Sequence, residues 1–167
     1  ISNTAHTIST MGDSHPCVCV KGESGCGKSF AAEVMASALV EAGCTSGDSV
    51  ITFTADSLRA PYVGQTTRRV DAIVSASAGC VLVIDDIDQL ADASDNFARE
   101  AISALAGAIK SGKASIVLVG ETSAVDHLFQ ENSALRNAVG WTVVCGKVQP
   151  KDVCRIVRNQ LATTHCA

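Results

Sequence analysis

The chain has 167 residues, of which 47% are hydrophobic and 18% charged, and its formal net charge is −4. This composition is typical of one folded domain with a single core and excludes a disordered chain. The acidic balance argues against a nucleic-acid surface, which usually appears as a cluster of basic residues. No apolar run approaches the ~20 residues that a membrane-spanning helix needs, so we expect neither a nucleic-acid partner nor a membrane.

The first half of the chain alternates between short apolar runs and segments of helical periodicity. An apolar run predicts a strand at 17–20, and apolar residues at helical spacing predict a helix at 29–42, which Gly43 ends. β-branched residues predict a second strand at 50–54. Apolar residues on one face predict a helix at 66–78.

The second half continues this alternation. The run CVLVI at 80–84 is apolar throughout, as in a strand buried on both faces of a parallel sheet. A helix is expected at 95–111, ended by Gly112, and a strand at 115–119. The remaining predicted elements are a short helix at 124–130, a strand at 141–145 and a last helix from Pro150 to about residue 161.

Strands and helices that alternate five times predict βαβ units with right-handed crossovers. We therefore expect an α/β fold, a five-stranded parallel sheet with helices on both faces. Residues 1–14 are polar and weakly patterned, and are interpreted as an N-terminal arm or linker. The predicted α/β domain spans 15–148, and 149–167 begins a further helical segment.

The segment GESGCGKS fits the phosphate-binding pattern G-x-x-x-x-G-K-S/T, follows a predicted strand and opens a predicted helix. Its glycines allow the main chain to approach closely, so that its N–H groups surround phosphate oxygens at the positive end of the helix. Lys28 is expected to bind the β- and γ-phosphates of ATP or ADP, and the Ser29 hydroxyl to bind Mg²⁺. The predicted nucleotide-binding residues are Gly22, Glu23, Ser24, Gly25, Cys26, Gly27, Lys28, Ser29 and Phe30.

Eight cysteines occur, without a C-x-x-C pair and mostly inside apolar runs. We expect reduced, buried thiols rather than a disulfide framework. Cys26 differs because it lies within the phosphate loop, where its oxidation would block nucleotide binding. The N-terminus shows no signal peptide, and the chain begins at Ile1 rather than Met, as a fragment or processed product would. These features favour the cytoplasm or an organellar matrix.

Acidic residues follow the buried strand CVLVI directly, at Asp85, Asp86 and Asp88. Carboxylates at the carboxyl end of a parallel strand lie in the crevice where such sheets bind ligands. This is a Walker B pattern, in which Asp85 would bind Mg²⁺ through water and Asp86 would orient or deprotonate the attacking water. The alternative for this pair is helix capping, and Asp88 is interpreted as a solvated carboxylate at a helix start.

Three further segments accompany the loop: APYVGQT (60–66), CVLVIDDIDQL followed by FAREAISAL, and ENSALRNAV (131–139). With HPCVCVKGESGCGKS, they make the chain resemble the AAA+ ATPases of the CbxX/CfqX family, which includes red-type Rubisco activases and relatives of sporulation stage V K and type VII secretion ATPases. The resemblance implies the P-loop AAA+ large subdomain, with most of the helical lid missing after 149–167. It also implies a ring, usually a hexamer, whose pore loop at Tyr62, Val63 and Gly64 grips a protein substrate.

The chain departs from the family pattern at its hydrolytic positions. The family has Glu where this chain has Asp86, and its arginine finger aligns with Ala138, which leaves Arg136 as the substitute. Thr122 or Ser123 is left as the polar contact to the γ-phosphate. Two functions stay open: an ATPase that remodels or threads a protein partner, and a degenerate module that binds nucleotide, hydrolyses it weakly and acts as a structural or regulatory subunit.

Overall fold

The computed structural model describes residues 15–60, 62, 64–92 and 94–146. These form a parallel five-stranded sheet with the spatial order β2-β3-β4-β1-β5. The strands are β1 (Cys17–Gly22), β2 (Val50–Thr54), β3 (Val81–Asp85), β4 (Ser115–Glu121) and β5 (Trp141–Cys145). The helices are α2 (Lys28–Glu41), α3 (Thr66–Ala76), α4 (Asn96–Ser111), α5 (Thr122–Glu131) and α6 (Ser133–Ala138), with single 3-10 turns η1 (Ala55–Leu58) and η2 (Ile87–Leu90).

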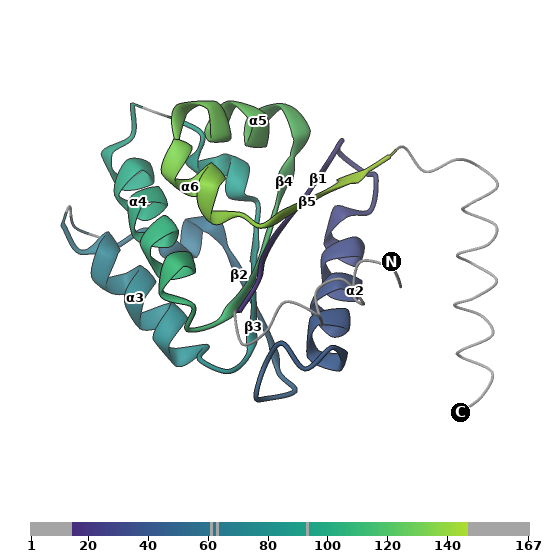
Figure 1. Ribbon diagram of the computed structural model, residues 1–167. Helices are drawn as coiled ribbons and strands as arrows, with labels where there is room; N and C mark the ends of the chain where they lie inside the picture. The colour runs from purple at the N-terminus through teal and green to yellow at the C-terminus, as the bar shows by residue number, and fades with distance from the viewer. Residues whose placement is uncertain (1–14, 61, 63, 93, 147–167) are drawn as a thin grey trace.

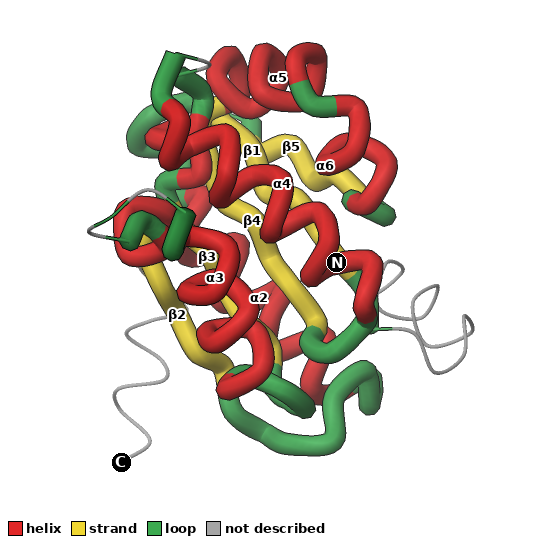
Figure 2. Tube along the Cα trace, turned by 90° about the vertical axis from the view of Figure 1, so that its left-hand side faces the viewer, coloured by secondary structure: helices red, strands yellow, loops and turns green. Residues whose placement is uncertain are grey.

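The sheet separates two helical layers (Figure 1). Helix α2 covers one face, and α3, α4, α5 and α6 cover the other. Figure 2, which looks onto the second layer, shows α3 and α4 in front of the strands. Alternate residues of β1 serve the two cores, since Cys17 and Cys19 face α4 whereas Val18 and Val20 face α2.

The predicted fold class and all five strands are confirmed, with bounds that differ by up to two residues. The burial of β3 on both faces, predicted from CVLVI, is also confirmed. Helix α6 was not predicted, because its six residues bury only Leu135 and show no helical period. The predicted helix at 150–161 lies outside the described residues. Within the described ranges, no helix is both long enough and apolar enough to cross a membrane.

The strand register brings the carboxyl ends of the strands to one edge of the sheet. Gly22 on β1 is the partner of Glu121 on β4 and of Cys145 on β5. Asp85 ends β3 and is the partner of Thr54 on β2. The phosphate loop after β1 and the acidic segment after β3 therefore lie at the same edge, the position that such sheets use for ligands.

Candidate functional site

The loop between β1 and α2 has the backbone that its glycines predict. Gly25 has a φ of 74° and Gly27 a φ of 87°, so both lie in the left-handed region that glycine adopts without steric cost. The loop closes through a hydrogen bond from the N–H of Cys26 to the carbonyl of Glu23, at 3.2 Å. Helix α2 begins at Lys28, immediately after Gly27. The sequence of the loop thus produces a tight turn that leads directly into a helix.

The first turn of α2 leaves four N–H groups, those of residues 27–30, without a partner. The first bond of the helix runs from the N–H of Ala31 to the carbonyl of Gly27, at 2.9 Å, and within the described part of the chain the four preceding groups donate to no protein acceptor. The helix also has no side-chain cap and no acidic residue in this turn. Unpaired donors at the positive end of a helix form an anion site, so the residues present fit a phosphate group.

Gly22 is needed for a different reason, which is close packing. A Cβ at this position would lie 2.5 Å from the sulfur of Cys26 and 2.8 Å from the carbonyl oxygen of Cys145. Only glycine therefore allows the loop to fold back over the end of β1 while β5 pairs alongside it.

Ser29 and Asp85 join the two sequence motifs. The Ser29 hydroxyl donates a hydrogen bond to the Asp85 carboxylate, with the oxygens 3.1 Å apart. A hydroxyl and a carboxylate are hard oxygen ligands, and Mg²⁺ in nucleotide sites is held by one or two such groups plus phosphate oxygens. The pair therefore fits Mg²⁺. Lys28 completes the group, and its ammonium donates to the carbonyl of Glu23 at 3.0 Å.

Asp86 has an unusual backbone. Its φ of 56° is the only positive value among the described non-glycine residues, and its N–H donates to the Asp85 carboxylate at 2.8 Å. Left-handed non-glycine residues are uncommon and cluster at functional sites. Although most of the side chain is exposed, partial desolvation raises the pKa of Asp86, and the charges of Asp85 and Asp88 add to this, against a smaller lowering by Lys28. A raised pKa makes the Asp86 carboxylate a better proton acceptor.

Asp88 has a structural role that the sequence did not reveal. It is half-buried, and its carboxylate accepts a hydrogen bond from the N–H of Glu121, at 3.1 Å. This bond ties the segment after β3 to the end of β4. The predicted helix-start position of Asp88 is confirmed, since it lies in the first turn of η2. Its carboxylate is half-buried rather than fully solvated, and it links two neighbouring strand ends through a partner 33 positions away in sequence.

Gly120 makes that link sterically possible. A Cβ at Gly120 would lie 2.8 Å from methyl carbons of Ile87 and Val125, and 3.1 Å from the Asp88 carboxylate. We expect Gly120→Ala to lower the free energy of unfolding by about 1–3 kcal/mol, as overpacked cores do. Urea denaturation would measure this.

Gly107 provides the matched control for that experiment. It lies in α4 with no atom within 4 Å of an added Cβ, so Gly107→Ala should stabilise the protein by up to about 1 kcal/mol. If the two variants have the same denaturation midpoint, the packing around Gly120 does not hold the strand ends together.

The polar residue after β4 lies at the edge of the sheet where the loop is. Thr122 is half-buried and begins α5, one residue beyond Glu121, the register partner of Gly22. The structure thus places Thr122 beside the loop, while Ser123 is exposed. Its contact to a phosphate stays a prediction.

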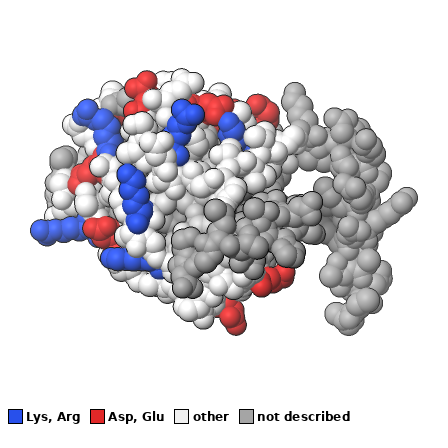
Figure 3. All heavy atoms as spheres, in the orientation of Figure 1, with Lys and Arg blue, Asp and Glu red and all other residues white. Residues whose placement is uncertain are grey.

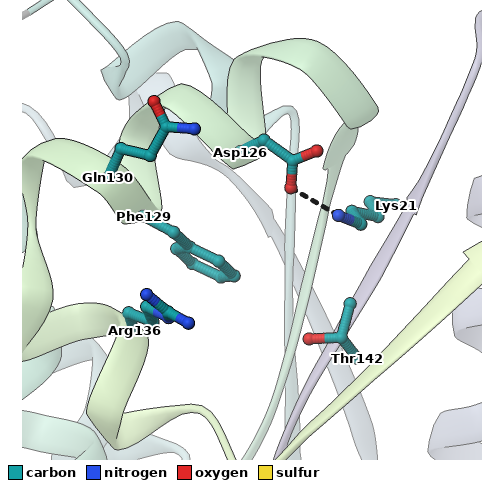
Figure 4. Close-up of a pocket in the computed structure, with 6 residues that line it drawn as sticks. All are labelled: Lys21, Asp126, Phe129, Gln130, Arg136 and Thr142. Atoms are coloured by element: carbon teal, nitrogen blue, oxygen red, sulfur yellow. Dashed lines mark hydrogen bonds and ion pairs between the residues drawn. The ribbon is translucent and has the colours of Figure 1, made fainter.

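Arg136 contributes to a pocket formed by residues of β1, α5, α6 and β5. It lies on α6 and lines a pocket of about 400 Å³, into which Figure 4 shows its guanidinium directed. The other lining residues are Lys21, Asp126, Phe129, Gln130 and Thr142. Lys21 forms an ion pair with Asp126, whereas Arg136 is exposed and has no ion pair with any described residue. Ala138, at the family's finger position, is half-buried against the core.

Tyr62 lies before α3, with 69% of its surface exposed. A tyrosine packed on its own domain would be largely buried, so this exposure is consistent with a side chain left free for a partner. Gly64 has a φ of 83°, and its N–H donates to the Glu100 carboxylate at 3.2 Å, which ties this segment to α4. Val63 lies outside the described residues. The role of these residues as a pore loop stays a prediction.

Comparison with known families and proteins agrees with this geometry. Residues 18–138 match the family described as "ATPase family associated with various cellular activities (AAA)". A "Putative cfxQ-like protein R730" of Acanthamoeba polyphaga mimivirus is 24% identical over 83% of this chain, and a "Protein cbbX homolog, chloroplastic" of Guillardia theta is 30% identical over 74% of it. Both names are consistent with the resemblance to the CbxX/CfqX family. The chain spans about a third of these relatives, at 36% and 34% of their lengths.

Solved structures share the fold. The ORC2 protein of Aeropyrum pernix in its ADP form superposes with a TM-score of 0.69 at 14% identity, covering 97% of this chain and 50% of that one. Hsp104 superposes at 0.65 with 17% identity, covering 94% of this chain and 28% of that one. The FIGL-1 AAA domain with ADP gives 0.57 at 21%, covering 89% and 49%. At these identities the comparison shows the architecture alone.

Proposed function

Since this chain belongs to the AAA family of ATPases, we propose that it binds ATP and ADP with Mg²⁺ at the loop from Gly22 to Ser29 and hydrolyses ATP. The hydrogen bond between Ser29 and Asp85 carries this proposal. In this bond the hydroxyl of the phosphate loop meets the carboxylate that ends β3, although the two residues are 56 positions apart. A glycine-rich turn with an incidental lysine would not require this contact.

Each group at this edge has a distinct task in the proposed reaction. The N–H groups of residues 27–30 bind phosphate oxygens, and Lys28 exchanges its bond to the Glu23 carbonyl for the β- and γ-phosphates. Ser29 and Asp85 hold Mg²⁺, which neutralises charge on the phosphates when bound. Asp86 orients the attacking water or accepts its proton, and Thr122 contacts the γ-phosphate.

We further propose that the chain works in a ring of copies or of related chains, with six as the expected number. The exposed Arg136 has no ion pair with any described residue, so its guanidinium is available to the nucleotide of a neighbouring subunit as the arginine finger. The exposed aromatic side chain of Tyr62 would contact a protein substrate in the central pore of this assembly, since large aromatic side chains are otherwise rarely left in water.

A second function is favoured by two positions. Asp86 carries a shorter side chain than the family's Glu, and Ala138 packs against the core where the family has its finger. A chain with both features would bind nucleotide, hydrolyse it weakly and act as a structural or regulatory subunit.

Positive and negative side chains are interspersed on the face shown in Figure 3, so the described part of this face offers a surface of mixed charge to any partner.

Calorimetry with ADP and ATP, with and without Mg²⁺, tests the binding step, and phosphate release tests hydrolysis. The proposal expects binding with both nucleotides and ATP turnover that depends on Mg²⁺. Nucleotide binding without ATP turnover would support the second function, the structural or regulatory subunit. No heat of binding with either nucleotide would refute both proposed functions.

For the partner contact, we expect Tyr62→Ala to remove the effect of a polypeptide substrate while ATP binding is unchanged. An aromatic anchor contributes about 2 kcal/mol or more, which is roughly a 30-fold loss of polypeptide affinity. ATP turnover would be measured with and without unfolded casein as the probe. Val50→Ala, which alters an exposed side chain on β2, is the control. Equal stimulation of Tyr62→Ala and the parent protein by casein would exclude this role.

A further inference from the structure

Two cysteines meet at the base of the phosphate loop. The point that a Cβ on Gly22 would occupy lies 2.5 Å from the sulfur of Cys26 and 2.9 Å from the Cβ of Cys145. The strand register explains this, because Gly22 and Cys145 are partners across β1 and β5. The turn from Glu23 to Cys26 then folds the second thiol back over Gly22. Both side chains thus reach the same methyl-sized space.

We propose that Cys26 and Cys145 form a reversible disulfide that lowers the affinity of the phosphate loop for nucleotide. This inference rests on the proposed nucleotide binding at the same loop. Both cysteines are free thiols in the structure. Cys145 lies on an edge strand and is half-buried, so a small oxidant can approach it.

The surroundings of this pair differ from those of the other neighbouring cysteines. Burial raises the pKa of Cys145, and the charge and hydrogen bond of the Cys26 thiol add to it, which agrees with direct contact between the two groups. Cys17 and Cys19 also lie near each other, but both are buried in the core, and burial raises the pKa of Cys19 to about 12. Both thiols of the core pair are closed to an oxidant, whereas Cys145 is half-buried, so the pair in the core stays reduced.

The chemistry is thiol–disulfide exchange with a small disulfide such as oxidised glutathione. The thiolate of the accessible Cys145 attacks one sulfur of glutathione disulfide, which forms a mixed disulfide and releases one glutathione thiolate. The Cys26 thiolate then attacks the Cys145 sulfur and releases the second. The two protons of the cysteine thiols end on the two glutathione molecules, so the protein is oxidised by two electrons and glutathione disulfide is reduced by two.

The disulfide would act on binding through the position of the loop. Its sulfur atoms must approach to about 2 Å, closer than two thiols in contact. Gly25 and Gly27 flank Cys26 and allow the backbone to follow it towards β5. Because N–H donors must lie within about 3 Å of phosphate oxygens, this displacement would move N–H groups of the phosphate loop out of hydrogen-bonding distance of the nucleotide. Disulfides in reducing compartments are usually transient and redox-sensing, which suits such a device.

Peptide mapping identifies the disulfide directly. Tryptic cleavage after Lys21, Lys28, Arg136 and Lys147 releases the peptides GESGCGK and NAVGWTVVCGK, each with one of the two cysteines. The chain is equilibrated with glutathione and glutathione disulfide, and ADP affinity is measured by calorimetry before and after. We expect the joined peptides together with at least a tenfold loss of ADP affinity, both reversed by reduced glutathione.

Linkage supplies a quantitative check. If the disulfide lowers ADP affinity by a given factor, saturating ADP must shift the dithiol–disulfide equilibrium by the same factor towards the dithiol. A tenfold loss of affinity therefore corresponds to a reduction potential that rises by about 30 mV with ADP. Unequal factors would contradict the proposed coupling.

Cys145→Ser is the decisive variant, because it removes one thiol of the pair and leaves the loop sequence intact. It should bind ADP like the parent chain and keep that affinity in glutathione disulfide. Cys44→Ser, at a half-buried thiol near the end of α2, should respond to oxidation like the parent chain. Loss of affinity in oxidised Cys145→Ser, or joined peptides with unchanged affinity, would overturn the proposal. Reduced protein that binds ADP but never yields the joined peptides would refute the disulfide alone, whereas joined peptides from a protein that binds no ADP would refute the proposed function.

Discussion

Lys28→Ala is expected to lower the affinity for ATP by about a hundredfold and to remove turnover. A hydrogen bond to a charged group contributes about 1.5–3 kcal/mol, and Lys28 would reach two phosphates. The loss is therefore roughly 3 kcal/mol or more, which is two powers of ten in affinity. The fold should be unaffected, because the Lys28 ammonium bonds only to the exposed carbonyl of Glu23 among the described residues. Calorimetry with ATP and Mg²⁺ would measure the change.

Lys113→Ala is the matched control for this experiment. Lys113 is exposed at the opposite end of the sheet, between α4 and β4. Its removal changes the net charge by the same amount without altering the loop. If the Lys28→Ala and Lys113→Ala variants bind ATP with equal affinity, the phosphates do not bind where the unpaired N–H groups of α2 lie.

The fold could be predicted from the sequence because its signals are local. Uniformly apolar runs such as that before Asp85 predict buried strands, and the glycines around Cys26 predict a loop of unusual backbone. The strand order follows only from the structure, and it makes β1 the neighbour of both β4 and β5.

The parts of the site that were missed depend on contacts between residues far apart in the chain. Asp88 is 33 positions from its partner Glu121, and Lys21 is 105 positions from Asp126. Cys26 and Cys145 meet only because both pack against Gly22. No spacing rule relates such pairs, so the sequence predicted neither the contact of Asp88 with Glu121 nor that of Cys26 with Cys145.

Asp86→Glu is expected to raise ATP turnover by up to about a hundredfold. The added methylene moves the carboxylate outward by roughly 1.5 Å, and a misplacement of about 1 Å at a reacting centre costs on the order of a hundredfold in rate. Partial desolvation and the charges of Asp85 and Asp88 raise the pKa of Asp86, which favours proton acceptance, and the expected gain in rate comes from the longer reach of Glu. Asp adopts the left-handed backbone of this position more easily than Glu, so Asp86→Glu should slightly lower the free energy of unfolding while it raises the rate.

Steady-state phosphate release at saturating ATP would measure the Asp86→Glu effect, since binding is carried by other residues. Asp86→Asn keeps the size and removes the charge, so it should be as slow as Lys28→Ala. Asp92→Glu lengthens an exposed carboxylate beyond η2 and should leave the rate unchanged. An Asp86→Glu rate no higher than that of the parent chain would place the limit elsewhere. The limiting group would then be the arginine finger, because the family's finger position is occupied in this chain by Ala138, which packs against the core. The degenerate module, which binds nucleotide and hydrolyses it weakly, would then be the better description of the chain.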